Sequence, residues 1–102
     1  MVEVGALALD AATHRVNWQA RPLKVGPTEF KLLHVLMTHP ERVHSRSQLL
    51  DKVWGDHVFI EERTVDVHVK RLRESLGAAA VMVETVRGAG YRLTAIPVSV
   101  LI

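Results

Sequence analysis

The segment from Glu61 to Leu76 is the feature of this 102-residue sequence that most restricts its fold. At about 100° per residue, four aliphatic side chains fall in one narrow stripe of a helix. These are Val65, Val69, Leu72 and Leu76. Gly77 follows directly and is a typical helix stop. The segment therefore predicts a helix that buries one side and presents the opposite side to solvent or to a partner.

The opposite side of this predicted helix is rich in cations. It carries Arg63, Val67, Lys70 and Glu74, flanked by Thr64, Asp66, Arg71 and Arg73, while His68 lies nearer the aliphatic stripe. A merely soluble helix usually mixes charges of both signs, but between residues 63 and 73 four cations face one acid, Asp66. Val67 is apolar and points away from the core, where a thymine methyl is a natural partner, and arginine can bind guanine or phosphate. Taken alone, the pattern fits contact with DNA and equally an ordinary solvated face, so both interpretations stay open at this point.

The first 25 residues predict a small antiparallel sheet of three or four strands. Short alternating patterns cover Val2–Val4, Leu7–Leu9, His14–Trp18 and Leu23–Val25, with breaks at Gly5, 10–13 and 19–22. Alternation of apolar and polar residues over so few positions is typical of strands with one buried face.

Two further helices are expected before residue 61. The first begins with Gly26 as N-cap and Pro27 in the first turn, and it ends before Pro40. Its core side carries Phe30, Leu33, Leu36 and Met37. The second begins at Ser45, which forms a capping-box pattern with Gln48, and it ends at Gly55. Its apolar side carries Leu49, Leu50, Val53 and Trp54, and a loop at 56–60 leads to the cationic helix.

The C-terminal part predicts a turn at 78–80 and a β-hairpin. Its strands are Val81–Val86 and Tyr91–Thr94, joined by Arg87-Gly88-Ala89-Gly90. The two glycines permit a tight turn, and Arg87 beside them is free to enter a narrow minor groove, where the potential is most negative. The alternative is an ordinary hairpin with a solvated arginine. Together, a cationic helix and an arginine-tipped hairpin favour a protein that contacts two grooves of DNA.

Composition excludes several other classes of protein. The length suits one domain, and 48% apolar residues are enough for a core. Without cysteine the chain has neither disulfides nor thiolate metal sites, which fits a reducing cytoplasm. No apolar run is long enough to span a bilayer, and the N-terminus lacks the pattern of a signal peptide. The six histidines show no metal-ligand spacing, and no nucleophile, acid–base pair or phosphate loop is present, so neither a metal, a cofactor nor an enzyme is expected.

Five motifs together resemble the effector domain of OmpR/PhoB response regulators over roughly residues 3 to 94. They are Gly26 to Leu33, Ser45-Arg46 with Gln48-Leu49-Leu50, Val53-Trp54-Gly55, Arg63 to Arg73 and Thr85 to Arg92. The resemblance implies an α+β fold, a winged helix-turn-helix with an N-terminal four-stranded antiparallel sheet, three helices and a C-terminal β-hairpin wing. Residues 1–95 would form this domain, and the apolar tail 96–102 has no assigned role.

The resemblance also implies a function. Such a domain would be the C-terminal half of a two-component response regulator, restrained by a receiver domain that a sensor histidine kinase phosphorylates. It would bind direct-repeat promoter sites as a tandem dimer and activate transcription by contacting the sigma subunit of RNA polymerase in the cytoplasm. Residues 39–43 and 65–68 are most similar to the PhoB-like branch, which controls phosphate-starvation genes. The alternative is a protein-interaction winged helix with only minor DNA contact.

Two groups of functional residues follow from the resemblance. The DNA contacts would be Arg63, Thr64, Val67, His68, Lys70, Arg71 and Arg73, with Trp54, Thr85, Arg87 and Tyr91. The polymerase contact would be built from Trp54, Gly55, Asp56, His57, Val58, Ile60 and Glu62. Two positions depart from the family pattern. Lys70 stands where arginine is frequent and lacks its bidentate geometry, and Ser47 stands where an acid often supports the polymerase contact.

Overall fold

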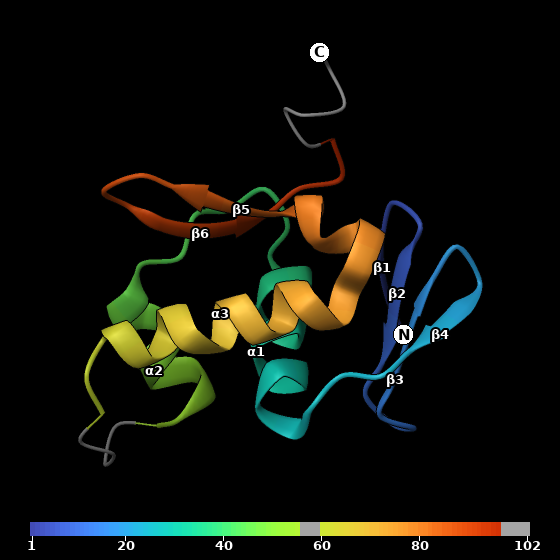
Figure 1. Cartoon of the computed structure of the whole chain (residues 1–102), viewed down its shortest axis with the longest axis horizontal. Coiled ribbons are helices and arrows are strands. Elements are labelled where there is room, and N and C mark those ends of the chain that lie inside the picture. The colour runs from blue at the N-terminus through green and yellow to red at the C-terminus, as the bar shows by residue number, and fades with distance from the viewer. Residues whose placement is uncertain (56–59, 97–102) are drawn as a thin grey trace.

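The expected architecture is confirmed by the computed structural model, which describes residues 1–55 and 60–96 (Figure 1). The elements in chain order are β1 (Val2–Val4), β2 (Leu7–Asp10), β3 (Arg15–Trp18), β4 (Arg21–Leu23), α1 (Pro27–Thr38), α2 (Arg46–Val53), α3 (Arg63–Leu76), the 3-10 helix η1 (Gly77–Met82), β5 (Val83–Val86) and β6 (Gly90–Leu93). Strands β1 to β4 form one antiparallel sheet in sequence order, and β5 pairs with β6.

The N-terminal sheet is a meander whose buried residues alternate along each strand. Leu7 and Leu9 of β2 and Val16 of β3 are buried, and Leu9 lies opposite Val16 in the register. The predicted break at residues 19–22 is wrong in its second half, because Arg21 and Pro22 belong to β4. β4 is the edge strand of the sheet, where proline is tolerated. Only Gln19 and Ala20 form the turn.

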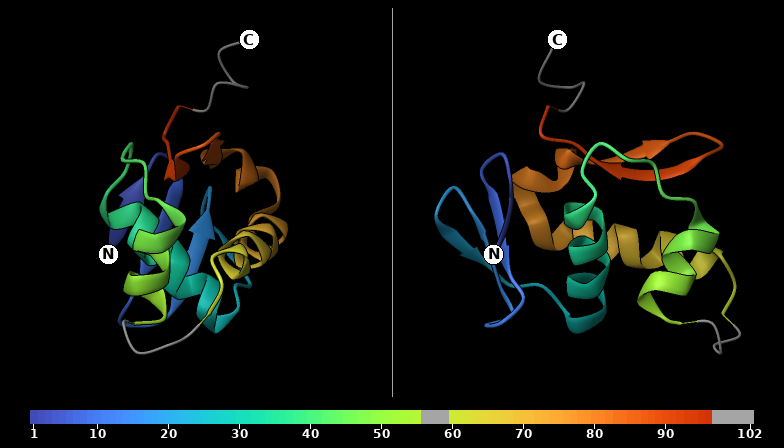
Figure 2. Two further views of the ribbon diagram at one scale, coloured as in Figure 1. Left: turned by 90° about the vertical axis from the view of Figure 1, so that its left-hand side faces the viewer. Right: turned by 180° about the vertical axis from the view of Figure 1, so that it is seen from behind.

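Helix α1 lies at the centre of the molecule. It contacts β1, α2 and α3, and Figure 2 shows it between the sheet at one end and α2 at the other. Gly26 is its N-cap and Pro27 lies in its first turn, as predicted. The capping box of α2 is also confirmed. The backbone N–H of Gln48 donates to Ser45 Oγ (3.1 Å), and the backbone N–H of Ser45 donates to the side-chain oxygen Oε1 of Gln48 (2.9 Å). One apolar cluster joins the sheet, the three helices and the hairpin.

Helix α3 buries the predicted aliphatic stripe completely, since none of its four members is more than 1% exposed. The chain then forms η1 instead of the expected turn followed by a strand from Val81. Ala79 and Met82 are buried three residues apart, which matches the repeat of a 3-10 helix, whereas Val81 is 47% exposed. The first strand of the hairpin therefore begins at Val83.

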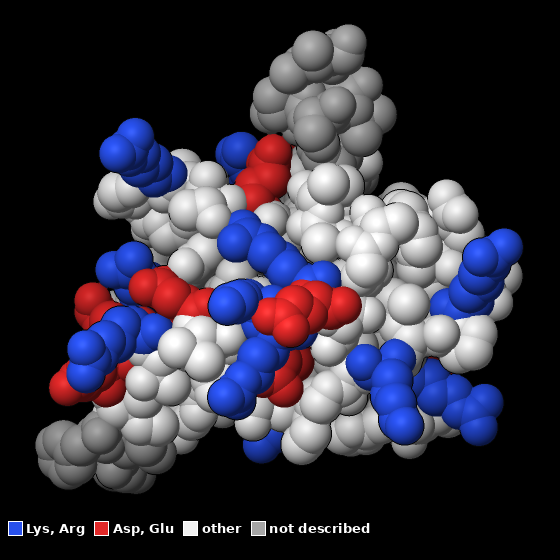
Figure 3. Space-filling model, in the orientation of Figure 1, with Lys and Arg blue, Asp and Glu red and all other residues white. Residues whose placement is uncertain are grey.

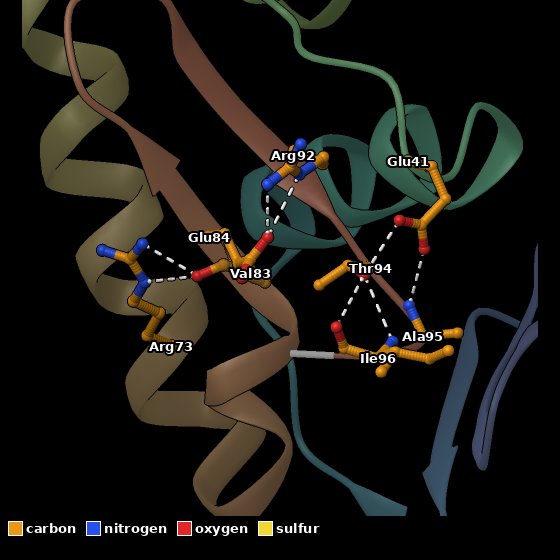
Figure 4. A network of polar contacts seen from close by, with 8 residues as sticks. All are labelled: Glu41, Arg73, Val83, Glu84, Arg92, Thr94, Ala95 and Ile96. Atoms are coloured by element: carbon orange, nitrogen blue, oxygen red, sulfur yellow. Dashed lines mark hydrogen bonds and ion pairs between the residues drawn. The ribbon is translucent and has the colours of Figure 1, made fainter. Parts of the chain in front are cut away.

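The hairpin is fastened along the link between α1 and α2. The Tyr91 amide donates to the His44 carbonyl (2.9 Å) and the His44 amide donates to the Tyr91 carbonyl (2.8 Å). Further along, the Glu41 amide donates to the Leu93 carbonyl (2.7 Å). The Glu41 carboxylate accepts from Thr94 Oγ1 and from the Ala95 amide, both at 2.9 Å (Figure 4). The link thus lines one side of β6 and connects the hairpin to the helices.

In the part of the chain that the structure covers, 1–55 and 60–96, no helix has the length and apolar character needed to cross a membrane.

Candidate nucleic-acid interface

The outer face of α3 presents one apolar and several cationic side chains, as the sequence predicts. Val67 is 48% exposed, and Lys70 and Arg71 are exposed beside it. Neither cation forms an ion pair with any residue that the structure describes. Arg63 at the start of the helix is exposed and pairs with Glu61 at 2.5 Å. Figure 3 shows that Lys and Arg side chains alternate with carboxylates on this side of the molecule.

The hairpin turn presents a second cation. Arg87 is exposed between β5 and β6, and it too has no ion pair among residues 1–55 and 60–96. Gly88 and Gly90 have φ angles of +79° and +138°, so the turn uses the freedom that the two glycines were expected to supply. Thr85 of β5 is exposed as well. A free arginine thus stands at the hairpin tip.

Arg73 lies differently from the other predicted cations, because the protein already binds its guanidinium. Nε and Nη2 donate to the Val83 carbonyl (3.1 and 2.8 Å), and Nη2 also donates to Thr85 Oγ1 (2.8 Å). The guanidinium carbon lies 5.8 Å from the centre of the Tyr91 ring. Figure 4 shows Arg73 reaching from α3 to the start of β5. These bonds fix the hairpin to α3.

Tyr91 is buried, and its hydroxyl donates to the carboxylate of Asp66. The same oxygen of Asp66 accepts from Arg46 Nε of α2 at 3.0 Å. Burial raises the pKa of Tyr91 above its usual value, and the bond to Asp66 adds to the effect. The charge of Asp66 raises the pKa of Arg46. α2, α3 and β6 therefore meet at one carboxylate.

His68 lies between the core and the outer face of α3, where it joins α3 to α1 and α2. Its Nδ1 is 2.6 Å from Glu29 Oε1, and its ring centre is 5.1 Å from that of Trp54. Burial acts to raise the pKa of Glu29, but the hydrogen bond with His68 and a hydrogen bond from the Glu29 backbone, with a smaller contribution from the charge of Arg71, outweigh it and lower the pKa. The carboxylate is therefore the acceptor, and His68 donates to it.

A groove of about 270 Å³ separates the N-terminus of α2 from the hairpin. Arg46 and Ser47 line one side, Thr85 and Gly88 line the other, and Glu62 also contributes. The groove therefore lies beside the hairpin turn that presents Arg87.

The structure places the predicted DNA-binding residues on α3, at the end of α2 and on the hairpin, and they differ in burial. Arg63, Val67, Lys70, Arg71, Thr85 and Arg87 are exposed, whereas Trp54, Thr64, His68, Arg73 and Tyr91 are partly or fully buried. Arg46 and Glu29 were missed as members of this network. The sequence gives no signal for either, because their partners lie 20 and 39 residues away.

Only part of the predicted polymerase surface can be located. Trp54 is the half-buried C-cap of α2, Gly55 is exposed, Ile60 is half-buried and Glu62 is the exposed N-cap of α3. Asp56, His57 and Val58 lie outside the described residues, as does the tail from residue 97. Among the described side chains, no three His, Asp or Glu lie close enough together to hold a metal ion.

Comparison with known proteins decides the family. Residues 20–93 match the family model described as "Transcriptional regulatory protein, C terminal". The chain belongs to the OmpR/PhoB family of transcriptional regulators. Over 96 residues it is 57% identical to the phosphate regulon transcriptional regulatory protein PhoB of Escherichia coli (strain K12), and the match covers 92% of this chain and 42% of that protein. The chain thus spans less than half the length of this curated relative.

Solved structures of similar DNA-binding domains agree with the fold. The DNA-binding domain of the response regulator AdeR, in complex with an intercistronic region, superposes with a TM-score of 0.78 and 33% identity, covering 87% of this chain and 94% of that one. The RstA DNA-binding domain of Klebsiella pneumoniae, in complex with the RstA box, gives 0.81 and 28%, covering 93% and 97%. The chain is a DNA-binding effector domain of this regulator family, which is not a family of enzymes.

Proposed function

We propose that this domain recognises promoter DNA with two surfaces at once, the outer face of α3 in the major groove and the hairpin tip in the minor groove. The observation that carries the proposal is the exposure of Val67 beside Lys70 and Arg71, which have no ion pair within residues 1–55 and 60–96. The helix that presents these side chains shares one hydrophobic core with the hairpin that carries Arg87. The valine offers contact to a thymine methyl, and the cations offer bonds to guanine or phosphate.

The eleven predicted contact residues divide into three groups under this proposal. Those with free side chains, chiefly Val67, Lys70, Arg71 and Arg87, contact DNA directly. His68, Arg73 and Tyr91 are held by Glu29, by β5 and by Asp66, so they shape the surface and add contact only with the atoms they leave exposed. Arg63, Thr64, Trp54 and Thr85 supply contacts to the sugar-phosphate backbone.

We further propose the biological setting from the similarity to PhoB. The domain acts in the cytoplasm as the effector half of a two-component regulator of phosphate-starvation genes. A receiver domain, phosphorylated by a sensor histidine kinase, controls it. It binds direct-repeat sites as a tandem dimer with half-sites about one helical turn apart.

Activation is proposed to use the surface between α2 and α3. Trp54, Gly55, Ile60 and Glu62, with Asp56, His57 and Val58, would contact the sigma subunit of RNA polymerase. Glu62 is exposed, and Trp54 is half-buried at the end of α2. Alanine substitution of Glu62 is expected to reduce transcription in a purified system while leaving promoter occupancy unchanged.

The assignment of α3 to the major groove of DNA and of Arg87 to the minor groove is tested by equilibrium binding. Arg71→Ala and Arg87→Ala are each titrated with a duplex that the wild-type chain selects from a random library. Arg71→Ala should cost about 1–3 kcal/mol and relax selectivity at one position if Arg71 reads a base edge. If it binds phosphate, affinity should fall for every duplex, and the salt slope should decrease by about one. Arg87→Ala should weaken binding most on sites with a narrow minor groove.

Arg15→Ala is the matched control, because Arg15 is also exposed but lies on β3 in the N-terminal sheet. Its affinity should stay close to that of the wild type. Unchanged binding by both Arg71→Ala and Arg87→Ala would contradict the proposed surface. An affinity without steep salt dependence would instead favour a protein-interaction module.

A further inference from the structure

Asp66 is a carboxylate on a surface that should attract phosphate. Its side chain is 35% exposed on α3, one residue from Val67. An uncompensated negative charge there would repel the DNA backbone and weaken binding. The charge is instead compensated from another helix, because Arg46 of α2 binds it at 3.0 Å. Because an acid at this position would weaken DNA binding if it were unpaired, we expect a structural role for Asp66.

Both bonds to Asp66 end on one oxygen, Oδ1, and they join three elements. Arg46 Nε donates from α2, and the Tyr91 hydroxyl donates from β6. Tyr91 in turn holds the α1–α2 link through its two backbone bonds with His44. Asp66 thus connects α3 both to β6 of the hairpin, through Tyr91, and to α2, through Arg46.

A second set of contacts between α3 and the hairpin lies two helical turns further along α3, at Arg73. Arg73 binds the Val83 carbonyl and Thr85 Oγ1 of β5, and it lies over the Tyr91 ring. Asp66 therefore fastens β6 to α3, and Arg73 fastens β5. With both strands attached, the hairpin tip that carries Arg87 has a fixed position relative to the outer face of α3.

We propose that Asp66 is a positioning residue for DNA recognition, which sets the hairpin and Arg46 relative to α3 so that the two DNA-contacting surfaces fit one duplex. The inference rests on the proposed two-groove function. Contacts held in place before binding lose less free energy to ordering, and this advantage is largest for a duplex that fits both surfaces. Loss of the carboxylate should therefore weaken selective binding more than general attraction to DNA.

The main test compares Asp66→Asn with Glu74→Gln. Each removes one negative charge from α3, but Glu74 is exposed and has no bond or ion pair to a described residue. Affinities are measured for the library-selected duplex and for a scrambled duplex of equal composition. Glu74→Gln should raise both affinities by the same factor. Asp66→Asn should lower the ratio of selected to scrambled affinity by about tenfold, the size expected for weakening hydrogen bonds to a charged group.

A second readout needs no DNA, because Tyr91 is the only tyrosine of the chain. Its ionisation can be followed by the ultraviolet absorbance of the phenolate. Because the carboxylate contributes to the raised pKa of Tyr91, Asp66→Asn should lower that pKa and Glu74→Gln should not. An unchanged Tyr91 pKa in Asp66→Asn would show that the contact is absent in solution, and would overturn the proposal.

Coupling between the two side chains is tested by Tyr91→Phe, which removes only the hydroxyl. The loss of selectivity in the double variant Asp66→Asn/Tyr91→Phe should be smaller than the sum of the two single losses, as for residues in one network. Additive losses would overturn the proposal.

The remaining outcomes separate this inference from the proposed function. If Asp66→Asn raises both affinities equally, the residue acts only through its charge and the proposal is wrong. If the loss is confined to one base pair, Asp66 reads that base directly, as a carboxylate can read cytosine N4, and the proposal is again wrong. If the wild-type chain prefers no sequence, the proposed function and the positioning role both fail, even where the phenolate titration confirms the contact.

Discussion

Residue 90 determines how closely the hairpin can approach the rest of the domain. A Cβ atom added there would lie 1.9 Å from the His44 carbonyl oxygen, and the backbone has a φ of +138°. Gly88, only two residues away, also has a positive φ of +79°, but a Cβ there would meet nothing within 4 Å. The two glycines therefore serve different purposes, because Gly88 only makes the turn whereas Gly90 also permits the bridge to the α1–α2 link.

This difference predicts unequal effects of the same substitution. Gly90→Ala should lower the free energy of unfolding by more than about 2 kcal/mol, because it combines backbone strain with a collision against a carbonyl group. Gly88→Ala should cost only about 1 kcal/mol, the strain of a left-handed residue alone. Urea unfolding of both variants measures the difference. Equal losses would contradict the close approach of Gly90 to His44.

At the scale of elements, the sequence predicts what is encoded locally. The aliphatic stripe of α3, the capping box of α2 and the two-glycine turn were all predicted and confirmed. The turn at Gln19 and Ala20 was placed too broadly. Both residues have positive φ angles, 51° and 65°, without the asparagine or glycine that usually mark such a turn. η1 was missed because its run of alanines has no distinctive pattern.

Long-range bonds could not be predicted from local patterns. Arg73 is the same residue type as the exposed Arg71 and Arg87, and only the folded chain shows that β5 binds Arg73 and that Asp66 binds Tyr91. Their direct roles toward DNA remain predictions. The exposure of Val67, Lys70 and Arg71 could be predicted, because helical periodicity alone places them opposite the buried stripe.

A buried histidine in the link between α1 and α2 is expected to make the stability of the domain depend on pH. His44 is 1% exposed, and its Nε2 has no hydrogen-bond partner within the described part of the chain. Burial, aided by the charge of Lys52, lowers the pKa of His44. In the unfolded chain the pKa is about 6.5, so the unfolded state takes up the proton at higher pH. The stability contributed by neutral His44 is therefore complete above about pH 6.5 and declines as the pH falls toward the lower folded pKa.

Urea unfolding at a series of pH values from neutral to mildly acidic measures this effect. The free energy of unfolding should fall with pH in the wild type, and His44→Leu should remove a part of that fall. His34→Gln, which changes a half-buried histidine of α1, is the control. This variant should retain the contribution of His44 to the decrease in the free energy of unfolding at low pH. An identical pH profile for the wild type and His44→Leu would contradict the assignment.

At the scale of the whole molecule, the domain is a flattened body of 37 × 34 × 21 Å with α1 at its centre. One continuous apolar cluster joins the sheet, the helices and the hairpin, so α3 cannot move independently of β6 without breaking core contacts. The N-terminal sheet lies at the end opposite α2 (Figure 2). The molecule therefore presents α3 and the hairpin as one preformed surface.

The central claim is that this one surface enters two grooves of the same duplex, and dimethyl sulfate footprinting tests it most directly. The reagent methylates guanine N7 in the major groove and adenine N3 in the minor groove, so one experiment reports on both. The wild-type chain should protect both kinds of atom on its selected duplex, and Arg87→Ala should lose the adenine protection while keeping that of guanine. Adenine protection that survives Arg87→Ala, or guanine N7 atoms left unprotected by the wild type, would contradict the account.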